Sequence, residues 1–463
     1  MTNPISSTPT PETPVLEAPT TEASTEAVVE AVAVKEPAPL PKAPAFLAKV
    51  QTITLDSGAT LLYNYVAGAP RLALRIFIPG GNTIDRIPGM MDVIDRLLFK
   101  GTYQYTAEQL AVKMDELCLD ADLNTGRDSS VLVASLMPED LAPSLELLSD
   151  ALFYSHLEEL PKEIDKIKGE LQLGLDTPKA KASDKLKREL FNGLPYGVTS
   201  TVLEEHLDKM SRVDSLFLPY QQAYRPNRFV ISVAGDIPRD VLVKQLNKAL
   251  DVPRPKASGT TSDVDRLLKA HSLKESKTFT IEANDASQAH IYQAWITPAA
   301  KHKDIPALSV LNTLLGAGGL SSRLFLELRD KQGLAYTVRS SLETMTHAGT
   351  FTLYIGTAPH NVAQCLEGFK TEIQKLIDTP VETQELEDAK RNLVGRRSVF
   401  LETVGAQAGY VGNAIVQGFS LKELEGMSDK IGAVTAADIQ RMAKLYFSKP
   451  SYTVVAGPSS CLP

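Results

Sequence analysis

The sequence of 463 residues has few of the residues that bind metals or form disulfides. Three cysteines cannot build a disulfide framework, so we expect a reducing compartment. Among the seven histidines no two are three to five residues apart, which excludes a local pair of histidine metal ligands. No apolar run reaches the roughly 18–20 residues that span a bilayer. The net charge of −8 argues against a nucleic-acid-binding surface, so we expect a cytoplasmic protein that binds neither membrane nor nucleic acid.

Residues 1–45 contain no aromatic side chain and carry nine of the 29 prolines. Six glutamates against two lysines give this segment a charge of −4, half of the total. Such a composition cannot bury enough apolar surface to offset the entropy of ordering, so it predicts a disordered tail. The segment lacks the basic and apolar regions of a secretory signal.

Two pairs of similar segments indicate a repeat. Tyr224–Gly235 and Tyr446–Gly457 begin 222 residues apart, and both start with tyrosine and end in Val-Ala-Gly. The apolar segments Leu72–Pro79 and His290–Pro298 end in prolines that are 219 residues apart. Two agreeing offsets favour a duplication, although common strand endings can also match by coincidence.

Long stretches with apolar residues at helical spacing follow these strand-like segments in both halves. They are Ala107–Leu119, Asp140–Leu152, Lys162–Leu175, Ile305–Leu315, Val362–Ile377 and Glu382–Leu401. Strands followed by helices, repeated, predict two domains of mixed α and β structure. We place them at 46–250 and 277–463, joined by a linker at 251–276 that is rich in Pro, Ser, Thr, Lys and Asp.

The segment Gly89–Thr102 resembles the zinc-binding helix of the M16 (pitrilysin/insulinase) metallopeptidases, in the branch of the processing peptidases. The match lies in Gly89 and in Leu-Phe-Lys-Gly-Thr at 98–102. In that family the helix carries His-x-x-Glu-His, whose histidines bind zinc and whose glutamate is the general base, on one helix face. The resemblance covers roughly residues 46–458. It implies an α+β fold of two homologous LuxS/processing-peptidase-like sandwich domains, each an antiparallel sheet flanked by helices, in a clamshell.

The residues at the zinc positions depart from this pattern. Asp92, Asp95 and Arg96 stand where the family has His, Glu and His, and Arg96 has no lone pair with which to bind a metal. Glu170 takes the position of the third zinc ligand, and Glu163 that of an auxiliary carboxylate. Because a carboxylate cluster without a cation is costly, we expect Arg96 to pair with Glu170 or Asp92 in place of zinc, with no metal bound by this chain. The alternative is a set of solvated charges on helix faces.

A second segment, Gly319–Tyr336, resembles the C-terminal signature of the same family. In that signature an arginine and a tyrosine seven residues later help to bind the substrate backbone and the developing oxyanion. Arg329 and Tyr336 match this pair in identity and spacing, and a guanidinium and a phenol are suitable donors to an oxygen that gains charge. The alternative is a structural arginine on a helix and a tyrosine at the start of a strand. Leu119–Asn124 resembles the edge strand on which the family's peptide substrates pair.

Together these features imply a non-catalytic subunit of an M16-type zinc metallopeptidase, inactive alone, that lends Arg329 and Tyr336 to a composite site for extended peptides. Its partner would be a zinc-bearing M16 subunit in a heterodimer, or a second copy in a homodimer, and the zinc would lie on the partner. One alternative is a non-enzymatic peptide-binding or scaffold subunit of a larger complex. A metallopeptidase with unusual ligands is a third reading, which Arg96 disfavours.

Overall fold

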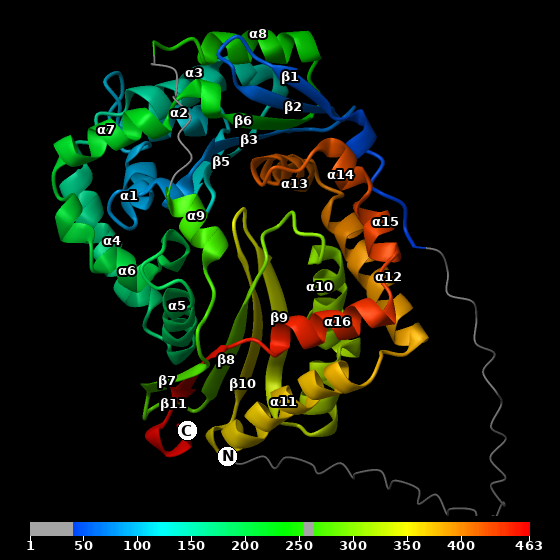
Figure 1. The fold of residues 1–463 in the computed structure, drawn as a ribbon. Coiled ribbons are helices and arrows are strands. Elements are labelled where there is room, and N and C mark those ends of the chain that lie inside the picture. Colours follow the sequence, from blue (N-terminus) through cyan, green and yellow to red (C-terminus); the bar gives the residue numbers. More distant parts are fainter. Residues whose placement is uncertain (1–39, 254–262) are drawn as a thin grey trace, which may run out of the picture. The chain divides into compact units, whose positions relative to one another are not determined.

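The computed structural model describes residues 40–253 and 263–463, which are organised by two β-sheets (Figure 1). The tail expected at 1–45 falls mainly on residues 1–39, which lie outside the described residues, as do residues 254–262 of the expected linker. We call residues 40–253 the first half and residues 263–463 the second half. No helix in either described range is long and apolar enough to cross a bilayer.

The first sheet has six strands in the order β1-β2-β6-β3-β5-β4. Its strands are β1 (Gln51–Thr54), β2 (Thr60–Tyr65), β3 (Leu72–Pro79), β4 (Asp120–Thr125), β5 (Ser129–Leu136) and β6 (Val230–Gly235). β2 and β6 are parallel, and the other neighbours are antiparallel. β3 is buried at six of its eight positions, which explains its nearly continuous apolar sequence.

The second sheet has five strands in the order β7-β11-β8-β10-β9. Its strands are β7 (Lys277–Glu282), β8 (Ala289–Thr297), β9 (Ala335–Thr344), β10 (Gly349–Thr357) and β11 (Tyr452–Gly457). β7 and β11 are its parallel pair. The order therefore repeats that of β2-β6-β3-β5-β4, and the fold is α+β with two similar sheets, as the sequence predicts.

Helices cover both sheets. The first half contributes α1 (Met90–Leu97), α2 (Ala107–Glu116), α3 (Leu141–Tyr154), α4 (Leu160–Gly174), α5 (Pro178–Leu190), α6 (Ser200–Glu204), α7 (Val213–Ala223) and α8 (Arg239–Ala249). The second contributes α9 (Asp263–Ala270), α10 (Ile305–Asn312), α11 (Val362–Asp378), α12 (Thr383–Phe400), α13 (Val404–Val416), α14 (Leu421–Glu425), α15 (Met427–Gly432) and α16 (Ala436–Phe447). The expected linker thus contains a helix, α9, whose Leu268 is buried.

Each half gives one helix to the sheet of the other. α5 packs on β11 and β8 of the second sheet, and α13 packs on β6 and β3 of the first (Figure 1). Gly412 permits the close approach of α13, because a Cβ there would lie 2.1 Å from a ring carbon of Phe77 on β3. The two halves are therefore held together by exchanged helices as well as by the connecting segment.

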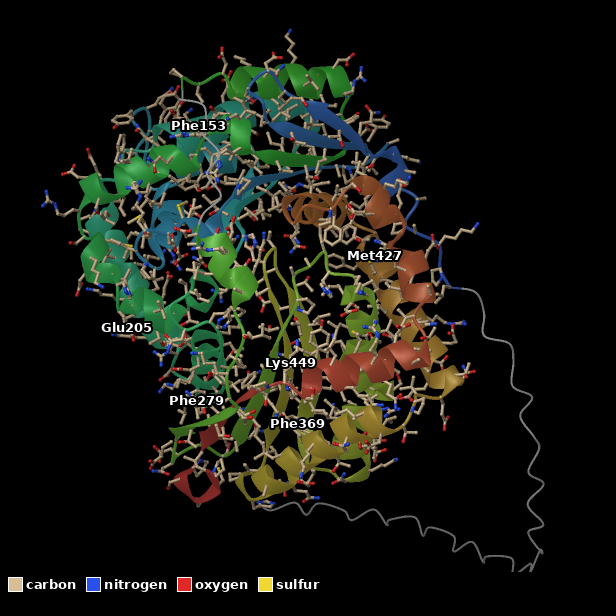
Figure 2. All side chains as sticks on the ribbon, in the orientation of Figure 1. Phe153, Glu205, Phe279, Phe369, Met427 and Lys449 are labelled. Atoms are coloured by element: carbon tan, nitrogen blue, oxygen red, sulfur yellow. The ribbon has the colours of Figure 1, made fainter. Side chains whose placement is uncertain are left out.

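The apolar core has a separate cluster in each half. Phe153 on α3 belongs to the first cluster and Phe369 on α11 to the second (Figure 2), and both are buried. A third cluster joins Leu186 and Leu190 of α5 to Tyr292 and Val454 of the second sheet. This third cluster positions α5 beside the site described below.

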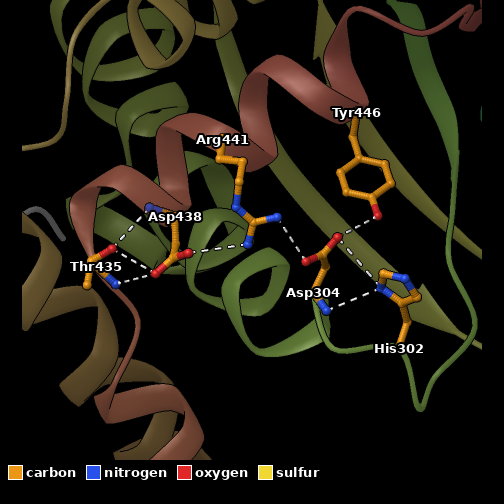
Figure 3. Close-up of polar contacts among 6 residues, drawn as sticks. All are labelled: His302, Asp304, Thr435, Asp438, Arg441 and Tyr446. Carbon is orange, nitrogen blue, oxygen red and sulfur yellow. Dashed lines mark hydrogen bonds and ion pairs between the residues drawn. The ribbon is translucent and has the colours of Figure 1, made fainter.

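A polar network fastens α16 to the start of α10 (Figure 3). The buried carboxylate of Asp304 accepts a hydrogen bond from the Arg441 guanidinium and one from the Tyr446 hydroxyl, both at 3.1 Å. The Arg441 guanidinium also donates to Asp438, at 3.2 Å. Because Asp304 is fully partnered, its burial is compatible with a stable second half.

Candidate functional site

A hydrogen-bonded turn before helix α1 fixes the position of the helix. The carboxylate of Asp85 accepts hydrogen bonds from the backbone N–H groups of Gly89 and Met91, both at 2.8 Å, and so satisfies two of the backbone donors at the start of the helix. Gly89 has a φ of +84°, which explains the glycine before the helix. Burial raises the pKa of Asp85 to about 7, although these hydrogen bonds act in the opposite direction.

Arg96, which was expected to pair with Glu170 or Asp92, pairs with both. Its Nη1 lies 2.6 Å from Oε2 of Glu170 on α4, and its Nε lies 3.4 Å from Oδ2 of Asp92. Asp92 and Arg96 are one turn apart on α1, so their side chains share a face. The pairs are partly open to solvent, with exposed fractions of 30% for Arg96 and 43% for Glu170, so they contribute little to stability.

The two carboxylates respond differently to this cation. Burial raises the pKa of Asp92, and Arg96 only partly offsets that effect. The hydrogen bond from Arg96 lowers the pKa of Glu170, which lies near the surface. The guanidinium therefore keeps Glu170 ionised, but it offsets the effect of burial on the pKa of Asp92 only in part.

These residues do not fit a zinc ion. The guanidinium of Arg96 contacts both carboxylates and has no lone pair to offer a metal. In residues 40–253 and 263–463, no group of three or more His, Cys, Asp or Glu side chains is arranged to hold a metal ion. An ion pair thus occupies the place in the degenerate motif where a metal ion would bind.

Asp95 and Glu163 are buried, with exposed fractions of 2% and 5%, so the alternative of solvated helix-face charges is wrong for both. The carboxylate of Asp95 accepts hydrogen bonds from Thr125 Oγ1 at 2.5 Å and from the Tyr224 hydroxyl at 2.6 Å. Burial raises its pKa to about 7, against the lowering effect of these bonds. Asp95 therefore joins α1 to β4 and to the chain after α7, which is a structural role.

Asp95→Asn is expected to flatten the dependence of stability on pH between pH 5 and pH 8. The folded pKa of about 7 lies above the ordinary value, so the folded state holds this proton more tightly than the unfolded state. Asp95 therefore contributes a loss of stability as pH rises from about 4 to about 7, and no further change above. Urea unfolding at pH 5 and at pH 8 gives the decrease in the free energy of unfolding between these pH values. We expect this decrease to be smaller by roughly 2–3 kcal/mol in the variant. Equal losses in the two proteins would contradict this assignment.

A cavity of about 670 Å³ opens beside the ion pair of α1. Its walls include Asp92 and Arg96 together with Arg127, Lys187 and Glu343. None of the last three was singled out from the sequence. Their positions along the chain are far apart. Lys187 reaches the second sheet because α5 packs on it, and Arg127 reaches it beside Asp128, which accepts a hydrogen bond from the Thr346 N–H.

The edge strand expected at Leu119–Asn124 is present as β4. A cavity of about 400 Å³ lies between β4 and helices α1 and α4. The backbone N–H of Leu123 donates to the side chain of Asp122 at 2.9 Å. A peptide that adds a strand to this edge and uses that amide must therefore displace the Asp122 carboxylate.

Arg329 and Tyr336 lie together in the second half. Arg329 belongs to a π-helical stretch, η9 (Phe325–Lys331), a rare conformation that is often found at functional sites. Its guanidinium carbon lies 4.5 Å from the ring centre of Phe325 and 5.0 Å from that of Tyr336. Tyr336, near the start of β9, is 80% exposed. Neither residue lines the 670 Å³ cavity, so the structure does not bring this pair to Asp92 and Arg96.

Comparison with protein families gives two matches along the chain. Residues 63–200 match the family described as insulinase (peptidase family M16), and residues 213–393 match the one described as peptidase M16 inactive domain. A Bacillus subtilis protein named as an uncharacterized zinc protease, YmxG, is 25% identical over 419 residues, which are 89% of this chain and 100% of that protein. An uncharacterized zinc protease of Mycobacterium leprae is 24% identical over 418 residues, 88% of this chain and 91% of its own.

Two solved structures have a similar fold. A peptidase M16 inactive domain from Pseudomonas fluorescens superposes with a TM-score of 0.78 at 22% identity, over 89% of this chain and 99% of that one. A protease from Helicobacter pylori gives a TM-score of 0.79 at 21% identity, over 90% and 100% of the two chains. At these identities the likeness establishes the fold alone.

Proposed function

Because the chain belongs to the insulinase (M16) peptidase family and carries an ion pair where that family binds zinc, we propose that it is a non-catalytic subunit. Its role is to complete the peptide-hydrolysing site of a zinc-bearing M16 partner. The contact of Arg96 with Glu170 carries the proposal, since it removes the means to hold the metal on this chain. The partner supplies the zinc ion and the general base.

The contribution of this chain is the pair Arg329 and Tyr336. Arg329 stacks against two aromatic rings, which limits the motion of its side chain. Its guanidinium, which is always charged, is therefore a hydrogen-bond donor with a fixed orientation. Donors that are already oriented stabilise an oxyanion as it forms at a peptide carbonyl. The high exposure of Tyr336 supports a site completed by a second chain, because a partner can reach this phenol directly.

A scaffold subunit that binds no substrate is the second candidate. The specific observation in its favour is the side chain of Asp122, which already occupies the Leu123 amide on the edge strand. An edge amide satisfied within its own chain is less available to an added strand. This candidate predicts that Arg329 and Tyr336 have no effect on peptide cleavage by any complex.

Purification of the tagged chain from its native cells tests the proposal. We expect an M16 protein with an intact His-x-x-Glu-His motif to co-purify at about one copy per chain, with about one zinc ion per mixed pair. The chain purified alone should contain no zinc by elemental analysis. Near-stoichiometric zinc in the chain alone would contradict the proposal, and a homodimer without such a partner would favour the scaffold.

A further inference from the structure

A second cavity, of about 190 Å³, adjoins the 670 Å³ cavity. The two share Arg127, Ser183, Lys187 and Glu343 in their walls. Its volume is below the range of whole-ligand pockets and suits a single side chain. We call it the basic subsite, and nothing in the proposed composite site uses it.

Both halves of the chain build the basic subsite. Arg339, Ser341 and Glu343 occupy alternate positions on β9, so their side chains lie on one face of the sheet. Thr350 and Thr352 on β10 face Glu343 and Ser341 directly in the strand register. This surface therefore carries hydroxyl groups beside charged ones. Helix α5, which packs on the second sheet, forms the opposite wall.

The charges of the basic subsite are unbalanced. Three cations, Arg127, Lys187 and Arg339, line it together with one carboxylate, Glu343. In the part of the chain that the structure describes, none of these four side chains has an opposite charge within 4.0 Å. An enclosed excess of two positive charges attracts an anion.

The nearest other carboxylates already have partners. Asp128 accepts hydrogen bonds from the hydroxyl of Tyr196 and from the backbone N–H of Thr346. Asp184 accepts hydrogen bonds from both the hydroxyl and the backbone N–H of Thr201. They reduce the positive potential at Arg127, whose Nη1 also donates a hydrogen bond to the carbonyl oxygen of Val198.

The position of Arg339 is fixed by an aromatic ring. Its guanidinium carbon lies 5.5 Å from the ring centre of Tyr354, its direct neighbour across the strands. The ammonium of Lys179 lies 5.2 Å from the same ring. A stacked guanidinium presents its donors in a planar fork, which matches the two oxygens of a carboxylate.

We propose that the basic subsite binds a carboxylate of an extended peptide, either an acidic side chain or a chain terminus. Arg339 and Lys187 are the accessible donors, Arg127 adds positive charge from the shared wall, and the threonine hydroxyls complete the site. The inference rests on the proposed function, because it takes a peptide as the ligand. It adds that the peptide is selected for negative charge.

Isothermal titration calorimetry on the full chain tests the subsite. The probes are two capped ten-residue peptides that differ only in a central glutamate or glutamine. We expect the glutamate peptide to bind at least about tenfold more tightly. Arg339→Gln should remove most of this preference and leave the affinity for the glutamine peptide unchanged. Glu343→Gln should increase the affinity for the glutamate peptide. Lys181→Gln, a charge-matched change on the exposed face of α5, should alter neither.

The outcomes separate this inference from the proposed function. Equal binding of the two peptides, or equal weakening of both by Arg339→Gln, would overturn the subsite and leave the composite peptidase standing. No binding of either peptide by the folded chain would overturn the subsite and count against peptide binding altogether. A shortened glutamine peptide with a free C-terminus identifies the source of the carboxylate. Gain of affinity by that peptide assigns the subsite to a chain terminus, and gain only by glutamate assigns it to a side chain.

Discussion

Arg329→Ala in this chain is expected to lower kcat/KM for peptide cleavage by the mixed pair about 100-fold or more, the usual effect of removing one oxyanion donor. The guanidinium lies against two aromatic rings that orient it, and alanine removes this oriented donor entirely. Tyr336→Phe keeps the stacked ring and removes only the phenolic hydroxyl, so it isolates the hydrogen bond. A fluorogenic peptide assay on the purified pair, in which only this chain is altered, measures both effects.

The control for these variants lies in the same π-helical stretch. Lys331 is exposed and, among the residues that the structure describes, forms its one ion pair with Glu327, at 2.7 Å, so Lys331→Ala should leave cleavage unchanged. Sedimentation of each variant with its partner shows whether the pair still forms. Unchanged cleavage by intact pairs that carry Arg329→Ala would overturn the composite site and favour the scaffold.

The sequence predicted those features that depend on short, regular patterns. The apolar run at residues 72–79 became β3, and the long amphipathic stretches became α3, α4, α11 and α12 with shifts of a few residues at their ends. Hydrophobic periodicity identifies such elements because burial of one face determines both pattern and structure. The flanks of α1 were equally informative, since Gly89 is required by the backbone conformation there.

Features that depend on distant contacts were not predictable in this way. The burial of Asp95 depends on Thr125 and Tyr224, and no local pattern links residues so far apart in sequence. The basic subsite joins Arg127 and Arg339 because the two halves pack together, through α5 on the second sheet and through the hydrogen bond from the Thr346 N–H to Asp128, the neighbour of Arg127. The polar residues Arg339, Ser341 and Glu343 at alternate positions of β9 were the available signal, but they also fit an ordinary solvated strand.

Substituting both ends of the degenerate motif should convert the ion pair into a metal site. Asp92→His with Arg96→His places two imidazoles one helical turn apart, next to Glu170, which already lies within hydrogen-bonding distance of residue 96. Both positions line the 670 Å³ cavity, so a zinc ion can reach them. Elemental analysis after dialysis should give about one zinc per chain for the double variant. A folded double variant without zinc would show that these positions do not correspond to the family's ligands.

Adding Glu170→Gln to the double variant should weaken zinc binding at least about tenfold, because it removes a charged ligand. The double variant should nevertheless fail to cleave peptides. Asp95, at the position of the base, accepts hydrogen bonds from the hydroxyl groups of Thr125 and Tyr224, and its carboxylate is too deeply buried to activate a water molecule. This chain would then lack metal binding and catalysis for two separate reasons. The double variant restores metal binding, but the burial of Asp95 still prevents catalysis. Cleavage by the zinc-loaded double variant alone would contradict this account of Asp95.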